Sequence, residues 1–249
     1  MPLGLPDHVN TCLFDLDGVL TQTAKVHAAA WKQMFDDYLK ARAEQRGEQF
    51  VAFDKVTDYD EYVDGEPRYD GVRSFLESRK IDLPQGTPDD SPDEETIDGL
   101  GNRKNEIVLR LIKEHGVEPY AGSVRYVKAA RDAGLHRVVV SSSTNARDVL
   151  GHAGMLDLFE DIVDGTVADR DHLKGKPAPD TFLEGAKIAG VDASQAAVFE
   201  DALAGVAAGR AGNFGVVVGV DRVGQADELH RHGADVVVGD LAELLDAGS

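Results

Sequence analysis

Two regions of the chain differ in the spacing of their hydrophobic residues. Beyond residue 120, short β-branched runs alternate with segments whose apolar residues recur at the helical period, which predicts alternating strands and helices. Between residues 23 and 119 the pattern predicts mostly helices and an acidic loop containing Pro and Gly. Predicted strands lie around 9–16 and at 136–140, 161–163, 197–199, 214–220 and 235–238; predicted helices lie at 24–43, 69–79, 102–115, 123–133, 147–152, 180–189, 204–211 and 241–245, and the loop at 83–98.

This alternation determines the expected fold class. Strands that alternate with helices form βαβ units, and such units build a parallel sheet covered by helices on both faces. Residues 138–140 and 216–218 are continuous runs of valine, as expected of strands buried on both sides. We therefore predict a doubly wound α/β core, made of residues 1–22 and 120–249, that is interrupted after its first strand by a small helical domain at residues 23–119.

The charge balance narrows the range of partners. Among 249 residues, 26 Lys and Arg stand against 45 Asp and Glu, a net charge of −19 that argues against nucleic acid or an anionic membrane as the main partner. The single cysteine, Cys12, cannot form an internal disulfide, and no apolar run is long enough to span a membrane. The N-terminus also lacks the pattern of a signal peptide, so we expect a cytoplasmic protein.

Polar and charged residues follow several of the predicted strands. In open α/β sheets, ligands bind beyond the carboxyl ends of the strands. Each group alone has an ordinary explanation: an Asp-rich turn, a helix N-cap, a solvated loop lysine, or an acidic pair that suits a helix dipole. Because all of these groups are expected at the same edge of the sheet, beyond the carboxyl ends of the strands, we favour one shared site. Its residues would be Asp15 and Asp17, Ser141, Lys176, and Glu200 with Asp201.

These residue types suit phosphoryl transfer. Asp15 and Asp17 are expected to face the same way on a strand, and gathered carboxylates favour a hard cation such as Mg²⁺. Ser141, expected at the start of a helix, and the N–H groups after it would bind phosphate, while Lys176 would supply positive charge. An aspartate can become an aspartyl phosphate, and a second carboxylate can shuttle the proton. Since no G-x-x-x-x-G-K-[ST] sequence is present, we expect no role for ATP.

The same residues resemble the motifs of the haloacid dehalogenase (HAD) phosphotransferase superfamily, in order and across the whole chain. The resemblance implies a Rossmann-like core, an inserted helical cap domain and Mg²⁺ as the cofactor. It implies that Asp15 is the nucleophile and Asp17 the general acid/base. The other implied roles are Mg²⁺ binding by Asp201 and Glu200, together with the Asp15 carboxylate and the Asp17 carbonyl, and phosphate binding by Ser141 and Lys176.

In more detail the sequence is similar to the β-phosphoglucomutase branch of that superfamily. The similarity lies in residues 14–27 followed by Trp31, and in 64–68, 102–105, 141–145, 176–180 and 199–205. It implies that Thr23 and His27 lie at a hinge and help to set the state of the acid/base aspartate. The implied phosphate and substrate contacts are Gly65, Arg68 and Lys104 in the cap, and Ser143 and Asn145 in the core.

One position departs from this pattern, because Asp64 stands where the branch has a lysine before the cap glycine. A carboxylate there should weaken the capture of a second phosphate. The main hypothesis is a mutase that converts β-glucose 1-phosphate to glucose 6-phosphate through an aspartyl phosphate and a bisphosphate. The alternatives are a phosphatase of small sugar phosphates and a non-catalytic sugar-phosphate-binding module. We expect a small phosphorylated sugar as the partner and a monomer, although the sequence fixes neither the sugar nor the oligomeric state.

Overall fold

The computed structural model describes residues 3–246, which form two units. The core unit contains the chain up to Gln22 and from Val117 onward, and the cap unit is Thr23–Gly116. Residues 117–119, placed in the insertion by the sequence pattern, belong to the core unit. The reason is local pairing: the Gln22 N–H donates to the Glu118 carbonyl at 2.9 Å, and Thr21 forms an antiparallel bridge with Pro119.

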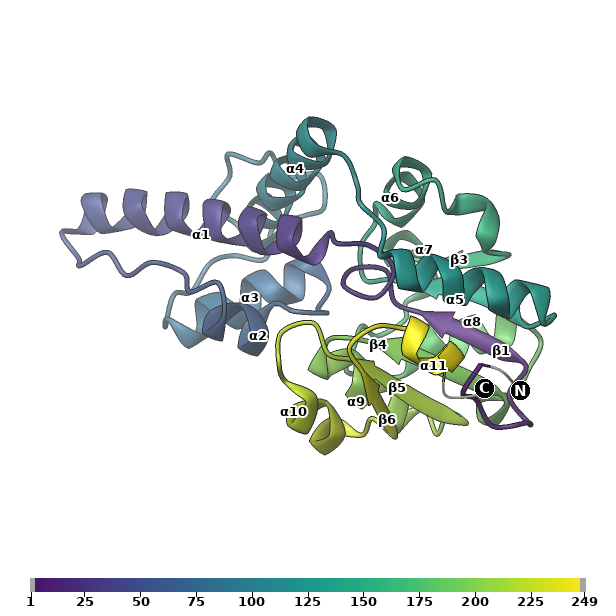
Figure 1. The fold of residues 1–249 in the computed structure, drawn as a ribbon. Helices are drawn as coiled ribbons and strands as arrows, with labels where there is room; N and C mark the ends of the chain where they lie inside the picture. Colours follow the sequence, from purple (N-terminus) through teal and green to yellow (C-terminus); the bar gives the residue numbers. More distant parts are fainter. Residues whose placement is uncertain (1–2, 247–249) are drawn as a thin grey trace. The chain divides into compact units, whose positions relative to one another are not determined.

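A six-stranded sheet forms the centre of the core unit (Figure 1). Its order is β3-β2-β1-β4-β5-β6, and every neighbouring pair is parallel. This confirms the predicted doubly wound α/β core, although the first strand is shorter than the predicted 9–16. The strands are β1 (Thr11–Phe14), β2 (His136–Val140), β3 (Asp161–Val163), β4 (Ala196–Glu200), β5 (Val216–Val220) and β6 (Val236–Val238).

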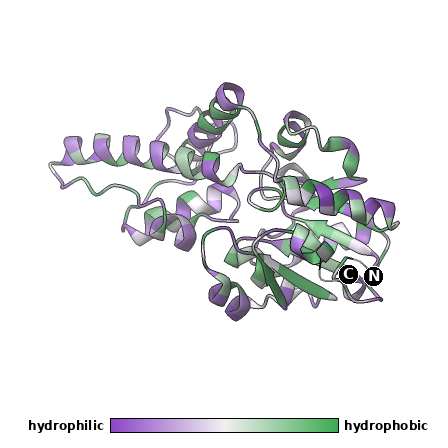
Figure 2. Cartoon of the chain, in the orientation of Figure 1, coloured by the Kyte–Doolittle hydropathy of each residue, from purple (hydrophilic) through white to green (hydrophobic). Residues whose placement is uncertain are grey.

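One face of the sheet is covered by α8 (Asp180–Ile188) and α9 (Leu203–Ala211). Leu13 of β1 lies opposite Val138 and Val198 on the neighbouring strands, and all three side chains are buried in the cluster beneath these helices. Figure 2 shows the strands mostly in the hydrophobic colour, in keeping with burial on both faces.

The other face carries alternate residues of the same strands, because successive side chains of a strand point to opposite sides. Phe14 lies opposite Phe199, with the two rings stacked 4.6 Å apart. Tyr126 of α5 (Ala121–Asp132) meets the Phe199 ring edge-on at 5.3 Å. A final helix, α11 (Ala242–Asp246), packs against α5. Burial of these aromatic rings holds α5 on the sheet.

The described part of the core unit also contains three short α-helices, α6 (Ala146–His152), α7 (Gly165–Asp171) and α10 (Ala226–His232), and two 3-10 helices, η1 (Leu156–Leu158) and η2 (Ala193–Gln195). The pattern did not predict α7 or α10, because each is short and has few apolar residues. Each is stabilised by a local feature at one of its ends. The Asp164 side chain accepts the Val167 N–H at the start of α7, and Gly233 ends α10 with φ 118°.

The cap unit consists of helices. The pattern predicts α1 (Ala24–Arg46), α3 (Arg68–Ser78) and α4 (Ile97–His115), but not the short α2 (Thr57–Tyr62). Helix α1 packs along α4 (Figure 1). The core of the cap unit is aromatic, since Phe35 stacks on Trp31 at 5.3 Å and contacts Phe53 and Phe75. Helix α4 begins five residues before the predicted start, because the Thr96 hydroxyl caps it by accepting the Gly99 N–H at 2.9 Å. Within residues 3–246, no helix has both the length and the apolar character needed to cross a membrane.

Candidate active site

Three adjacent strands bring candidate residues to the carboxyl edge of the sheet. Asp15 directly follows β1, Ser141 directly follows β2, and Glu200 is the last residue of β4. Backbone pairing continues past the strand ends: the Asp15 N–H donates to the Phe199 carbonyl and the Ser141 N–H to the Val163 carbonyl, both at 2.9 Å. The sheet therefore fixes where each of these side chains leaves the backbone.

Lys176 lies in the middle of this edge. Its Nζ is 2.5 Å from Asp15 Oδ1 and 2.5 Å from Glu200 Oε1, and it lies 5.0 Å from the centre of the Phe182 ring. The residue is only 2% exposed, so the alternative of a solvated loop lysine is wrong. A buried ammonium needs such partners, because transferring an unpaired charge out of water is strongly unfavourable.

The buried charges shift one another's protonation. Burial alone would lower the pKa of Lys176, but the carboxylates of Asp15 and Glu200 outweigh it and raise that pKa well above its ordinary value. Burial raises the pKa of Glu200, although Lys176 acts in the opposite direction. Lys176 is therefore a permanent cation beside the carboxylate of Asp15.

Three carboxylates at this edge could hold a cation. One oxygen each from Asp15, Glu200 and Asp201 lies within 4.8 Å of the others. Hard oxygen donors suit Mg²⁺. Lys176 pairs with Asp15 and Glu200, and Asp201 adds a third carboxylate to the group, so negative charge is left for a divalent ion to balance. The residues present therefore fit a divalent metal.

Asp17 lies beyond the end of β1. The strand ends at Phe14, and Asp17 belongs to a turn in which it bridges to Thr21. The expectation that a shared strand pleat aligns Asp15 and Asp17 is therefore wrong. The contact assigned to Asp17 through its backbone carbonyl is untested and stays a prediction.

Two glycines leave room for the acidic side chains. A Cβ on Gly205 would lie 1.8 Å from Glu200 Oε1, and one on Gly18 would lie 1.7 Å from Asp201 Oδ2. Gly18 also has φ 92°, a conformation that side-chain-bearing residues rarely adopt. The motif glycines are thus required by the close approach of the carboxylates.

Serine hydroxyls organise the loop after β2. The Ser143 N–H donates to Ser141 Oγ at 3.1 Å, and the Asn145 N–H donates to Ser143 Oγ at 3.2 Å. Helix α6 begins only at Ala146, so the expectation that Ser141 starts a helix is wrong. Serine side chains that bond nearby backbone groups compete with helix formation, which explains the delay. Ser141 is 2% exposed and directly follows β2, the strand that pairs with β1, which Asp15 directly follows.

In the cap unit, the buried Lys104 pairs with His27, which is partly buried. Lys104 Nζ donates to His27 Nδ1 at 2.9 Å and lies 4.7 Å from the centre of the Trp31 ring. Burial, and next the Lys104 charge, hold the pKa of His27 well below its ordinary value, so the imidazole is neutral near pH 7. Thr23, 1% exposed, precedes α1, and its carbonyl accepts the His27 N–H at 2.9 Å.

Arg68, at the start of α3, has different neighbours from Lys104. It donates to the Tyr69 hydroxyl at 2.9 Å, and that hydroxyl donates to Asn102 Oδ1 at 2.9 Å. Asn102 Nδ2 in turn donates to the carbonyls of Pro88 at 3.0 Å and Asp90 at 2.9 Å. Hydrogen bonds thus connect Arg68 to the loop that the sequence predicted only as an acidic surface segment.

Gly65 lies between α2 and α3, in the segment where Asp64 replaces a lysine. The next residue, Glu66, is partly buried, and burial, together with the nearby Asp70, raises its pKa to about 7. Its carboxyl is therefore partly protonated near neutral pH. Sequence reasoning gave no role to Glu66, Tyr69 or Asn102, because the burial and the partners of a single polar side chain have no sequence signal.

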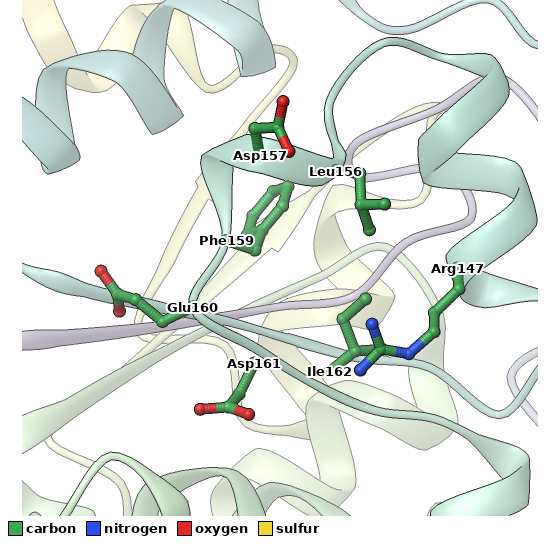
Figure 3. A pocket seen from close by; sticks show the side chains of 7 residues that line it. All are labelled: Arg147, Leu156, Asp157, Phe159, Glu160, Asp161 and Ile162. Atoms are coloured by element: carbon green, nitrogen blue, oxygen red, sulfur yellow. The ribbon is translucent and has the colours of Figure 1, made fainter.

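A cavity of about 350 Å³ lies elsewhere in the core unit (Figure 3). Arg147, Asp157, Glu160 and Asp161 are the charged residues that line it. Asp161 begins β3, so this cavity borders the amino end of a parallel strand, whereas Asp15 and Glu200 lie at carboxyl ends. Glu160 is already paired with Arg137, and none of the predicted site residues lines the cavity.

Fold and site together define an enzyme of the phosphotransferase or phosphatase type. Residues 9–213 match the family described as haloacid dehalogenase-like hydrolase. The chain belongs to this family, and the hypothesis of a non-catalytic binding module is set aside.

Individual relatives narrow the class. The chain is 58% identical to a protein named Beta-phosphoglucomutase from Mycobacterium tuberculosis, over 98% of this chain and 94% of the relative. It is 31% identical to the Beta-phosphoglucomutase of Bacillus subtilis, over 93% and 90%. Among solved structures, a beta-phosphoglucomutase from Clostridium difficile aligns with a TM-score of 0.73 and 28% identity, covering 95% of this chain and 93% of that one. The similarity to the β-phosphoglucomutase branch is confirmed.

Proposed function

We propose that this enzyme is a Mg²⁺-dependent phosphosugar mutase that interconverts β-glucose 1-phosphate and glucose 6-phosphate. The observation that carries the proposal is the buried Lys176, held 2.5 Å from both Asp15 and Glu200 at the carboxyl edge of the sheet. The name of the 58% identical relative supports the choice of a mutase and of glucose phosphate as substrate.

In the proposed reaction, Asp15 carries a phosphoryl group and passes it to the 6-hydroxyl of β-glucose 1-phosphate. Asp15 Oδ then attacks the 1-phosphate of the resulting bisphosphate, and the bond from phosphorus to the sugar oxygen breaks, which releases glucose 6-phosphate. Asp17 takes the proton from the attacking hydroxyl and returns it to the leaving oxygen. Mg²⁺, held by Asp15, Glu200 and Asp201, would neutralise charge on the transferring phosphate.

The remaining residues bind and orient in this proposal. Lys176 and Ser141 hold the transferring phosphate, and Ser143 and Asn145 supply further contacts from the loop after β2. The cap contributes substrate contacts (Gly65, Arg68 and Lys104) and sets the state of Asp17 (Thr23 and His27). The neutral imidazole of His27, with Lys104 at Nδ1, supports a role in hydrogen bonding over one in charge neutralisation.

A phosphatase of small sugar phosphates is the second candidate. Asp64 favours it, because a carboxylate at this position of the cap should weaken the binding of a second phosphate. Glu66, two residues on, adds a carboxyl whose pKa of about 7 leaves it partly charged. A mutase must also keep water away from the aspartyl phosphate, since attack by water releases inorganic phosphate.

Phosphorus NMR separates the two candidates. Purified enzyme is given Mg²⁺, β-glucose 1-phosphate and a trace of glucose 1,6-bisphosphate. We expect conversion to glucose 6-phosphate without inorganic phosphate, and no conversion in excess chelator or with Asp15→Asn. The exposed carboxylate of Asp132 on α5 provides the matched control, Asp132→Asn, which should behave like the native enzyme. Stoichiometric release of inorganic phosphate would contradict the mutase and establish the phosphatase.

A further inference from the structure

The loop after β5, residues 221–225, contacts the backbone on two sides of the candidate metal site: the turn that follows Asp17, and Asp201. It contributes no carboxylate to the group formed by Asp15, Glu200 and Asp201. Arg222 reaches the turn that follows Asp17: its Nε donates to the Gly18 carbonyl at 2.8 Å and a terminal nitrogen donates to the Val19 carbonyl at 3.4 Å. Its other terminal nitrogen donates to the Gly239 carbonyl at 2.8 Å. The guanidinium thus joins two segments that are far apart in the sequence.

The Arg222 side chain is itself held in place. Its charged group lies 3.6 Å from the centre of the Tyr120 ring and 3.4 Å from Asp240 Oδ2, and the side chain is only 14% exposed. A planar guanidinium that stacks on a ring and donates to several fixed carbonyls loses little freedom for each bond formed. A lysine could not reproduce this set of contacts.

The turn that Arg222 contacts is tight. Within it, the Gly18 N–H donates to the Thr21 carbonyl at 2.8 Å, and the Thr21 N–H donates to the Leu16 carbonyl at 3.0 Å. The Ser123 hydroxyl also donates to the Val19 carbonyl at 2.6 Å. Contacts to the Gly18 and Val19 carbonyls therefore fix the position of the turn that contains Asp17.

Gln225 reaches the other side of the site. Its Nε2 donates to the backbone carbonyl of Asp201 at 3.1 Å. The loop is rigid between the two contact points, because Asp221 Oδ1 accepts the N–H groups of Gly224 at 2.7 Å and Gln225 at 2.8 Å. One short, internally bonded loop thus connects the backbone next to Asp17 with the backbone of Asp201.

The turn that contains Asp17 lies very close to Asp201. Gly18 approaches Asp201 so closely that a Cβ on Gly18 would lie 1.7 Å from Asp201 Oδ2. We infer that Arg222 and Gln225 are positioning residues, which set the distance between the Asp17 turn and Asp201 and thereby the geometry of the metal site. The inference rests on the proposed roles of Asp17 and Asp201.

The test uses two variants of the full-length protein, Arg222→Gln and Gln225→Met. With Arg222→Gln we expect amide hydrogen exchange at residues 18–21 to become about 10-fold faster. With both variants we expect Mn²⁺, used as the paramagnetic probe, to bind about 10-fold more weakly. The turnover number should fall by a similar factor, while the KM for the sugar phosphate changes less than about twofold.

The control is Arg231→Gln, which removes an exposed arginine of α10 that pairs with Glu228 one helical turn away. It should leave exchange and Mn²⁺ affinity unchanged. Native Mn²⁺ affinity and native exchange at residues 18–21 in folded Arg222→Gln would overturn the inference. If Arg222→Gln fails to fold, Mn²⁺ binding by Gln225→Met decides alone, and native affinity there overturns it. These readouts do not depend on which product forms, so a phosphatase result in the NMR assay leaves them valid.

Discussion

Lys176 shows how much of the site depends on a single buried charge. Its ammonium lies between the carboxylates of Asp15 and Glu200, all three of which are buried. Burying an ion pair is not stabilising in itself, but removing one partner leaves uncompensated charge in the interior. Lys176 is therefore expected to support the folded state as well as the chemistry.

We predict that Lys176→Met, measured without divalent metal, lowers the free energy of unfolding by about 3–5 kcal/mol. Adding Glu200→Gln to this variant should restore part of the loss, because it removes one of the two stranded carboxylates. Denaturant titration at neutral pH measures both effects. Lys187→Met, at an exposed position of α8, is the matched control. A change of less than about 1 kcal/mol in Lys176→Met would show that the buried charges are balanced in some other way.

At the scale of elements, the acidic loop before α4 is more ordered than its composition suggests. Asn102 on α4 donates to the carbonyls of Pro88 and Asp90, and Thr96 Oγ1 donates to Asp90 Oδ2 at 2.6 Å. The Tyr69 hydroxyl donates to Asn102 and accepts from Arg68. The loop is thus part of the support for the Arg68 side chain.

We predict that Asn102→Ala destabilises the protein by about 1–2 kcal/mol, since it removes hydrogen bonds at a partly exposed position. Proteolysis within residues 85–98 should become faster in this variant. Limited proteolysis followed by mass spectrometry locates the cut, with Glu114→Ala, exposed near the end of α4, as the control. Unchanged cleavage of the loop in Asn102→Ala would mean that Asn102 does not hold it.

At the scale of the whole molecule, the net charge of −19 repels a negatively charged substrate. Two carboxylates already balance Lys176 at the sheet edge, so that residue does not reverse the long-range repulsion. Salt shortens the Debye length from about 30 Å at 10 mM to about 8 Å at 150 mM. The field of the whole protein should therefore slow the approach of substrate most strongly at low salt.

We predict that kcat/KM for β-glucose 1-phosphate rises about twofold or more between about 10 mM and 150 mM NaCl at saturating Mg²⁺. Steady-state kinetics in NaCl and in KCl at equal ionic strength distinguish screening from binding of a particular ion. A fall in kcat/KM with added salt would show that local positive groups, and not the net charge, control the approach of substrate.

The sequence by itself determined the order of the core elements and most of the site. Residues 138–140 and 216–218 are all valine, an apolar and β-branched residue that is typical of strands buried on both faces. The strands of the sheet could therefore be predicted. Because parallel strands deliver their carboxyl ends to one edge, the meeting of Asp15, Lys176, Glu200 and Asp201 could also be predicted. Short helices such as α7 and α10 could not, because capping and tertiary packing stabilise them without a hydrophobic period.

Only the tertiary structure decided how the charges are arranged. The structure places Asp17 in a turn beyond the strand, where it bridges to Thr21. The burial of Lys176 between Asp15 and Glu200 and the pairing of His27 with Lys104 depend on contacts between distant segments. The same holds for Arg222, which looks like a surface arginine in the sequence but donates to carbonyls of the turn around Gly18. Sequence patterns report which residues are apolar and which are charged, whereas the partners of a charge, and so its pKa and its role, are fixed when the chain folds.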